Sequence, residues 1–255
     1  MRTVVFQSYR VTDVAPWISQ CMDTVRAWAA YKGYDYVFYG DELFDRLPEW
    51  FKERIDHQIL PMSDLARLLV AGELLEQDYE RTIWVDADVL IFDTTRFSVN
   101  VQHNCAFCRE VWAGVADDGR FQLFTRVNNA VSMFTRESPL LDFYIEACQL
   151  LVRHKPGPID RLDLGTTFLA RLHSIAYFPL LTNVGMLSPW LIMEIAADRH
   201  ELVKQYVETM QFPLYAANLC GLLVGEGLLS EAKIELVVAR LLSGQGDILN
   251  RFCPE

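Results

Sequence analysis

The stretch Thr82-Ile-Trp-Val-Asp86-Ala-Asp88-Val-Leu-Ile-Phe92 combines an apolar run with two carboxylates placed two residues apart. Its β-branched, aromatic and aliphatic residues predict a buried strand. An ionised carboxylate in an apolar interior is costly unless a partner offsets its charge. Asp86 and Asp88 therefore either leave the strand at the edge of a sheet or lie beside a cation.

The elements that precede this stretch predict an α/β fold. Residues 3–9 read as a first strand, residues 16 to about 32 as a helix that ends at Gly33, and residues 34–39 as a second strand. A strand, a helix and a strand in succession favour a parallel pair joined by a right-handed crossover. We therefore expect a single mixed, mostly parallel sheet flanked by helices.

The rest of the chain continues the alternation and becomes helical toward its end. Nothing in the sequence resembles an interdomain linker, so one domain over residues 1–255 is expected, with a core at about 1–185 and a helical part at about 186–255. The further predicted elements are a short helix within 41–56, a helix at 63–76 with Ser63 as N-cap, strands at 105–111 and 127–134 around a turn at 114–119, helices at 139–154 and 160–173, a strand at 175–181, helices at 188–210 and 230–252, and a buried strand plus loop within 212–229.

Composition excludes several classes of protein. The hydrophobic fraction of 51% argues against disorder, and the net charge of -11 argues against a nucleic-acid partner. The sequence shows no secretory signal and no apolar run long enough for a membrane span, although peripheral membrane contact stays open. Six cysteines without a secretory signal indicate reduced thiols and a cytoplasmic location. Cys105-Ala-Phe-Cys108 has metal-ligand spacing, but its apolar surroundings favour a structural role.

Two small motifs carry the candidate chemistry. If Asp86 and Asp88 are extended, they point to the same side, about 6.6 Å apart along the strand. Beyond the carboxyl end of a parallel strand, such a pair suits a hard divalent ion, Mg²⁺ or Mn²⁺. In Ser63-Asp64-Leu-Ala-Arg67, Asp64 and Arg67 share one face of a helix. Alone this is a typical surface ion pair, but beside the aspartate pair it becomes a candidate site.

The segments SDLARLL (63–69) and GELLEQDYERTIWVDADVLIFD (72–93) together resemble the centre of nucleotide-sugar-dependent glycosyltransferases of the GT-A fold. One retaining group, which includes mannosyltransferases and the large clostridial glucosylating toxins, has an Asp-x-x-Arg helix before an Asp-x-Asp strand. The glycogenin and lipopolysaccharide galactosyltransferase group has a nearly identical acidic string. This chain lacks the Gly-Gly-Ile-Tyr of the first group before the acidic motif, which leaves its subgroup open.

The resemblance implies a role for each matching residue. Asp88 and Asp86 would bind the metal, Asp86 would also contact the ribose or the donor sugar, and His200 is a candidate third ligand only by residue type. Asp64 and Arg67 would contact the donor sugar and the diphosphate. Weaker candidates are Asn129 and Asp163, which follow the motif, and the nucleotide base would lie at the end of the first strand, against Phe6, Gln7, Ser8 and Tyr9.

The function that this resemblance implies is transfer of a sugar, of hexosyltransferase type, from a nucleotide-diphosphate sugar to a saccharide or other hydroxyl acceptor. Mn²⁺ or Mg²⁺ would be the cofactor, the anomeric configuration would be retained, and the product would belong to polysaccharide biosynthesis. An acidic chain steers anions poorly, so a metal–diphosphate complex is the sensible ligand.

Two other functions stay open. The segment from Asp86 onward resembles the nucleophile loop of haloacid-dehalogenase-type phosphatases, in which the first aspartate attacks phosphorus and Asp117-Asp118 would supply the later acidic pair. Against it, Val89 stands where that loop has Gly-Thr, and the motif normally follows the first strand. The other alternative is a non-catalytic protein that binds sugar nucleotides.

Overall fold

A computed structural model describes residues 1–99, 102–116 and 118–254 as a mixed α/β protein. Its central sheet has six strands in the order β2-β1-β3-β6-β5-β7, and three of the five neighbouring pairs are parallel. The predicted mixed, mostly parallel sheet is thus confirmed. These strands are β1 (Thr3–Ser8), β2 (Asp35–Tyr39), β3 (Arg81–Val85), β5 (Cys105–Val115), β6 (Phe121–Thr135) and β7 (Leu180–Leu181).

A second sheet, which the sequence did not predict, connects the segment after β3 with the C-terminal part of the chain. It has the order β4-β9-β8 and contains β4 (Val89–Ile91), β8 (Val184–Met186) and β9 (Ala216–Asn218). Because β4 follows the aspartate pair and β9 belongs to the C-terminal part, this sheet brings residues near 88 and 218 together.

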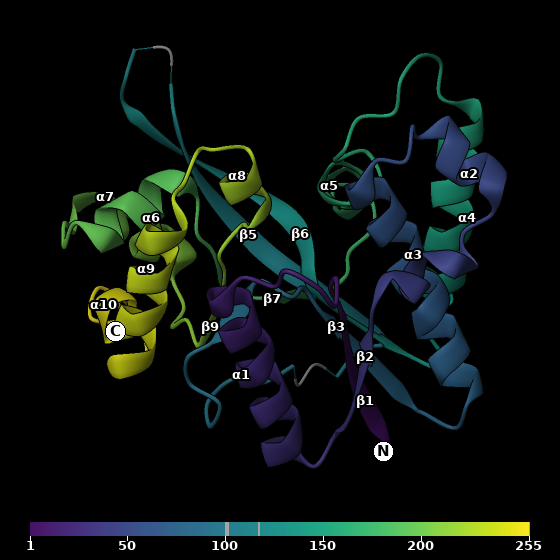
Figure 1. Cartoon of the computed structure of the whole chain (residues 1–255), viewed down its shortest axis with the longest axis horizontal. Helices are drawn as coiled ribbons and strands as arrows, with labels where there is room; N and C mark the ends of the chain where they lie inside the picture. The colour runs from purple at the N-terminus through teal and green to yellow at the C-terminus, as the bar shows by residue number, and fades with distance from the viewer. Residues whose placement is uncertain (100–101, 117, 255) are drawn as a thin grey trace.

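Helices cover the central sheet in two groups. Figure 1 shows α2 to α5 gathered to the right of the sheet, and α6, α7, α9 and α10 to its left. Each group has its own apolar cluster, and α1 packs with the C-terminal helices. The helices are α1 (Pro16–Lys32), the 3-10 helix η1 (Asp41–Arg46), α2 (Glu49–Arg54), α3 (Ile59–Glu76), α4 (Pro139–His154), α5 (Thr166–His173), α6 (Pro189–Ala196), α7 (Glu201–Met210), α8 (Leu222–Gly225), α9 (Glu231–Ser243) and α10 (Asp247–Asn250).

The strand predicted through the aspartate pair is wrong in one respect. β3 ends at Val85, and the amide of Val89 donates to the carbonyl oxygen of Asp86 at 3.1 Å, which makes a tight turn. β4 then begins in the other sheet. Asp86 and Asp88 are therefore not residues of a continuous extended strand, and the first of the two sequence-based expectations, that they leave the strand at its edge, is confirmed.

Several predicted helix boundaries also need correction. α3 begins four residues before Ser63, with Gln58 as its N-cap, so Ser63 lies inside the helix. The predicted helix at 188–210 divides into α6 and α7, because Asp198 takes a left-handed conformation with φ 55°. The one at 230–252 likewise stops before Gln245, whose φ is 47°. The helix expected at 160–173 is formed only from Thr166, and the strand at 175–181 only at its last two residues.

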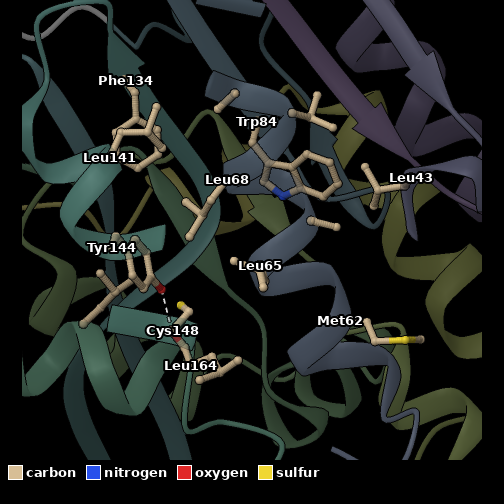
Figure 2. Close-up of a cluster of buried hydrophobic side chains, with 14 of the residues drawn as sticks. Leu43, Met62, Leu65, Leu68, Trp84, Phe134, Leu141, Tyr144, Cys148 and Leu164 are labelled. Atoms are coloured by element: carbon tan, nitrogen blue, oxygen red, sulfur yellow. Dashed lines mark hydrogen bonds between the residues drawn. The ribbon is translucent and has the colours of Figure 1, made fainter. Parts of the chain in front are cut away.

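The apolar cluster on one side of the sheet fixes the orientation of α3. Figure 2 shows Leu65 and Leu68 of α3 between Trp84 of β3 and Tyr144 of α4. The Tyr144 hydroxyl donates to the backbone oxygen of Leu164 at 2.6 Å, which ties α4 to the segment before α5. Since these side chains are buried, α3 cannot rotate without opening the core, so Arg67 stays directed at Asp86 after β3 and Asp64 at Asn129 of β6.

Two other sequence-based expectations concern single features. The six cysteines of the chain are free, and both Cys105 and Cys108 are buried in β5, so their spacing serves packing. Over the residues that the structure describes, no helix is long and apolar enough to cross a membrane.

Candidate functional site

Arg67 joins the two predicted motifs. Its Nη2 lies 3.1 Å from Oδ1 of Asp64, one helical turn away, and its Nη1 donates to Oδ1 of Asp86 at 3.0 Å. The same Nη1 also donates to the backbone oxygen of Asn129 at 3.1 Å. Asp64 and Arg67 are both buried, so this is an interior charge cluster and not a surface ion pair.

Trp84 and Gln7 hold Asp86 from the sheet side. The Trp84 indole Nε1 donates to Oδ1 of Asp86 at 2.6 Å, and the guanidinium of Arg67 lies 4.8 Å from the centre of the Trp84 ring. Gln7 Nε2 donates to the backbone oxygen of Asp86 at 3.2 Å. Residue 86 is therefore fixed in both its side chain and its backbone, although it lies in a turn.

Asp88 is held by the C-terminal part of the chain. Asn218 Nδ2 donates to its Oδ1 at 2.9 Å, and the amide of Gly221 donates to its Oδ2 at 2.7 Å. Burial, and then the nearby charge of Asp86, raise the pKa of Asp88 to about 6. Burial also raises the pKa of Asp86 and Asp64, with Arg67 opposing the rise in both cases. The site thus holds carboxylates whose charge is incompletely offset.

These side chains line one pocket of about 230 Å³. Four carboxylates and three guanidinium groups face it, and one of those guanidiniums, that of Arg161, pairs with Glu226 at its rim. The lining therefore carries a surplus of negative charge. The residues of the pocket are Leu60, Asp64, Arg67, Asp86, Asp88, Glu110, Trp112, Arg126, Asn128, Asn129, Arg161, Leu162, Gly165, Thr166, Asn218, Cys220, Leu222 and Leu223.

Asn129 and Gly165 shape the pocket around Asp64. Asn129 Nδ2 donates to Asp64 Oδ1 at 2.9 Å, so Asn129, which the sequence proposed only weakly, does reach the site. A Cβ at Gly165 would lie 2.9 Å from Asp64 Oδ2 and 3.3 Å from the Asn129 amide. Glycine at 165 therefore leaves the space into which the free oxygen of Asp64 points.

Some pocket residues were missed at the sequence level. Glu110 is buried in β5 and accepts from Arg126 Nη2 at 2.8 Å and from Asn128 Nδ2 at 3.2 Å, both on β6. The hairpin was predicted, but its register, which places Glu110 opposite Arg126, was not. Asn218 was also missed, because its contact with Asp88 spans 130 residues.

Other predicted site residues do not line this pocket. Asp163 faces the other way, where it pairs with Lys155 and accepts from the amide of Asp160 at 2.7 Å. His200 lies between α6 and α7, with its ring 5.8 Å from that of Phe252, so the structure does not bring it to the aspartate pair.

The end of β1, predicted as the base site, also lies outside the pocket lining. Phe6 is buried against Trp84, at 5.2 Å between ring centres, and Gln7 is buried beneath Asp86. The Ser8 hydroxyl donates to the backbone oxygen of Gly40 at 3.4 Å. Tyr9 packs at the edge of the apolar cluster formed by α1 and the C-terminal helices. Gln7 therefore holds the backbone of Asp86 in place without lining the pocket.

The residues present suit a divalent cation that is bound together with the phosphates of a substrate. Within the described part of the chain, His, Cys, Asp and Glu form no group of three that could hold a metal by themselves. Mg²⁺ is commonly bound by one or two carboxylates together with waters and substrate phosphates, and not by a cage of protein ligands. Asp86 and Asp88 supply the two carboxylates, and the negative surplus of the pocket favours a cation.

No protein-family model matches the sequence, and the search of curated proteins finds no match. Among solved structures, the chain is similar to a glycosyltransferase involved in the glycosylation of the major capsid of PBCV-1 (12% identity, 94% of this chain and 100% of that chain, TM-score 0.49). It is also similar to mouse xyloside xylosyltransferase 1 in its apo form (12% identity, 86% of this chain and 98% of that chain, TM-score 0.45). A third similar structure is the glycosyltransferase GlyE of Streptococcus pneumoniae TIGR4 (11% identity, 96% of this chain and 64% of that chain, TM-score 0.38). At this level of similarity, the chemistry of the site remains the basis for a function.

Proposed function

We propose that this protein is a metal-dependent glycosyltransferase that uses a nucleotide-diphosphate sugar and a hydroxyl acceptor. The observation that carries the proposal is the buried Asp64–Arg67–Asp86 cluster beside Asp88, in a pocket with a surplus of negative charge. The Asp-x-x-Arg and Asp-x-Asp motifs of the sequence supply exactly these four residues to one place, as the resemblance to GT-A glycosyltransferases requires.

The chain's own residues account for most of the chemistry. Breaking the anomeric bond leaves negative charge on the diphosphate, and Arg67 holds a fixed positive charge nearby in a water-poor site, where such charge acts most strongly. Asp64, whose Oδ2 faces the space beside Gly165, accepts hydrogen bonds from hydroxyls of the donor sugar and orients it. Trp84 and Gln7 keep Asp86 in place while the ligand changes.

Asp86 and Asp88 would hold the Mn²⁺ or Mg²⁺ ion, and Asn218 adds an amide beside Asp88. When bound, the ion offsets charge on the leaving diphosphate. Retention of configuration and a hexosyl donor follow from the sequence resemblance and belong to the same proposal.

A phosphatase of the haloacid-dehalogenase type has no comparable support. Asp86, the nucleophile of that alternative, is held by Arg67 and Trp84 through one oxygen, which suits a fixed charged ligand as well as a nucleophile and does not favour the phosphatase. Asp118 pairs with Arg120 near the exposed tip of the β5–β6 hairpin and is not among the pocket residues, while Asp117 lies outside the described residues. Asp118, the described member of the acidic pair of that alternative, is therefore not placed beside Asp86.

The test combines binding and turnover. The purified chain is mixed with Mn²⁺ and a panel of UDP-, GDP- and CDP-sugars, and thermal shift and nucleotide release are followed. Stabilisation by one nucleotide sugar, dependent on Mn²⁺ and lost in Asp88→Ala, supports the proposal. Release of phosphate from monoesters would instead favour the phosphatase, and binding without turnover in the presence of diverse acceptors would favour a non-catalytic binding protein.

A further inference from the structure

The β5–β6 hairpin extends beyond the pocket and carries an open aromatic surface. In Figure 1 this hairpin rises from the sheet between the two groups of helices. A second cavity, of about 570 Å³, lies along it and is lined by Trp112, Leu123, Phe124, Thr125 and Arg126. Trp112 and Arg126 line both this cavity and the acidic pocket, so the two spaces are neighbours.

The register of the hairpin sorts its side chains onto two faces. Glu110 pairs with Arg126, Trp112 with Phe124 and Gly114 with Gln122. Directly opposed residues of a ladder share a face, and so do residues two positions along each strand. One face therefore runs from the Glu110–Arg126 pair at the acidic pocket outward over three successive pairs, which we call the hairpin platform (Glu110, Trp112, Gly114, Gln122, Phe124 and Arg126).

The opposite face of the hairpin already has partners. Val111 and Ala113 are buried in the cluster of the C-terminal helices, and the Phe121 ring lies 6.2 Å from that of Trp190 on α6. Phe121 and Phe124 are equally exposed, at 43%, but their neighbours differ. The Phe121 ring contacts Trp190, whereas Phe124 lies beside Trp112 along the cavity, which Leu123 and Thr125 also line.

Two details indicate that the platform receives a ligand. Gly114 lies within β5, where a Cβ would approach Phe124 Cε2 to 3.3 Å, so glycine keeps the Phe124 ring accessible. The Arg126 side chain is 38% exposed and lines both spaces, so its guanidinium can donate to a ligand oxygen there while Nη2 stays paired with Glu110.

We propose that the hairpin platform is the acceptor subsite and that the acceptor is a saccharide, an inference that rests on the proposed function. One face of a pyranose ring consists of C–H groups, which lose contact with water when they lie against an aromatic ring. Trp112 and Phe124 supply such rings, while Gln122 and the guanidinium of Arg126 supply hydrogen bonds to hydroxyl or ring oxygens. The reacting hydroxyl lies at the Glu110 end, where the platform meets the donor pocket.

The test compares two exposed phenylalanines on opposite faces of the same hairpin. Phe124→Ala removes a platform ring, and Phe121→Ala is the matched control, since both side chains are 43% exposed. Trp112→Ala provides a second platform variant. The labelled proteins are applied to an array of defined oligosaccharides in the presence of Mn²⁺ and, in turn, UDP, GDP or CDP. Hydrolysis of the donor sugar by water is measured separately.

The expected result is that wild type and Phe121→Ala retain the same oligosaccharides, while Phe124→Ala and Trp112→Ala bind them about tenfold more weakly. Donor hydrolysis should stay unchanged in the control variant Phe121→Ala. If all variants bind the oligosaccharides equally, or if wild type binds none, the hairpin platform is not a saccharide site. If the platform variants instead lose affinity for the nucleotide, the rings stack on its base and the saccharide assignment is wrong. Failure of wild type to bind or hydrolyse any nucleotide sugar would overturn the proposed function, while the array still decides the platform.

Discussion

Arg67 on α3 and Asp86 after β3 form the link between the two motifs of the site, with Nη1 of the arginine 3.0 Å from Oδ1 of the aspartate. The pair is largely shielded from water, and the same arginine contacts Asp64 at 3.1 Å. A single guanidinium thus holds two carboxylates that come from different elements. Its planar set of donors explains why arginine is suited to this position.

Arg67→Lys is therefore expected to impair both function and stability. Lysine keeps the charge but cannot donate in two directions from a fixed plane, so one of Asp64 and Asp86 loses its partner. Transfer should fall on the order of a hundredfold, and the free energy of unfolding should fall by about 1 to 3 kcal/mol. Steady-state kinetics and urea denaturation measure the two effects.

The matched control for this substitution is Arg2→Lys. Arg2 pairs with Asp35 at 3.1 Å, but both side chains are about half exposed. Exposed ion pairs contribute little, so the free energy of unfolding should change by less than about 0.5 kcal/mol. If the two arginine substitutions lower the free energy of unfolding equally, the buried Asp64–Arg67–Asp86 cluster contributes no more to stability than an exposed ion pair.

Gly165→Ala is expected to disturb Asp64 with a single methyl group. The new Cβ would lie 2.9 Å from Asp64 Oδ2, so the carboxylate must move away from the position in which it faces the ligand. The KM for the donor sugar should rise about tenfold or more, with a smaller effect on the affinity for the free nucleoside diphosphate. Steady-state kinetics gives the KM for the donor sugar, and isothermal titration gives the affinity for the free nucleoside diphosphate.

Gly72→Ala is the control for Gly165→Ala. Gly72 lies in α3 with nothing within 4 Å of an added Cβ, so alanine there should raise the free energy of unfolding by about 0.5 to 1 kcal/mol and leave the KM unchanged. A normal KM in Gly165→Ala would show that Asp64 does not orient the donor.

Local patterns predicted the elements that depend on local periodicity. α1 and α4 have the bounds expected from their apolar spacing, since each begins with a proline in its first turn. The i,i+3 spacing of Asp64 and Arg67 was also readable. The helix break at Asp198 was not, because a nonglycine residue there takes a left-handed conformation. The break near Gln245 was missed, although Gly244 and Gly246 flank it and glycine commonly ends helices.

Long-range contacts account for the missed part of the site. The partner of Asp88 is Asn218, and only the second sheet, which pairs β4 with β9, brings them together. His200 carried the expected ligand type, but residue type alone does not place a side chain. Glu110 was hidden in a strand whose pairing register no local pattern defines.

The pKa of about 6 for Asp88 predicts how ligand binding depends on pH. Because the ionised form binds metal, affinity for the Mn²⁺–nucleotide complex should decrease as pH falls through about 6. In Asp88→Asn, affinity should be low at all pH values, without this inflection. Titration calorimetry between pH 5 and pH 8, on the order of one unit on either side of the pKa, measures the change.

The same pKa predicts a stability effect in the metal-free protein. A carboxylate whose pKa is raised by folding binds its proton more tightly in the folded state, so its contribution to stability is lost as pH rises from about 4 to about 6. Relative to wild type, Asp88→Asn should therefore gain about 2 to 3 kcal/mol between pH 4 and pH 7. Chemical denaturation at both pH values tests this, and a pH-independent difference would contradict the raised pKa.

Arg161, before α5, and Glu226, after α8, form an ion pair across the rim of the pocket. Leu222 and Leu223 of α8 line the pocket on the Glu226 side, and Leu162 lines it on the Arg161 side. The pair therefore connects the two segments between which a ligand must enter. Since both side chains are partly exposed, the pair should contribute little to global stability.

Glu226→Arg is expected to separate these segments by like-charge repulsion and to speed nucleotide release several-fold. Combined with Arg161→Glu, the swapped pair should restore the wild-type rate, and the difference should shrink at high salt because exposed charges are screened. Stopped-flow displacement of a fluorescent nucleoside diphosphate in Mn²⁺ gives the rates. Release that is unchanged in the single variant, or fast in the single variant and not slowed in the swap, would show that this pair does not hold α8 against the rim.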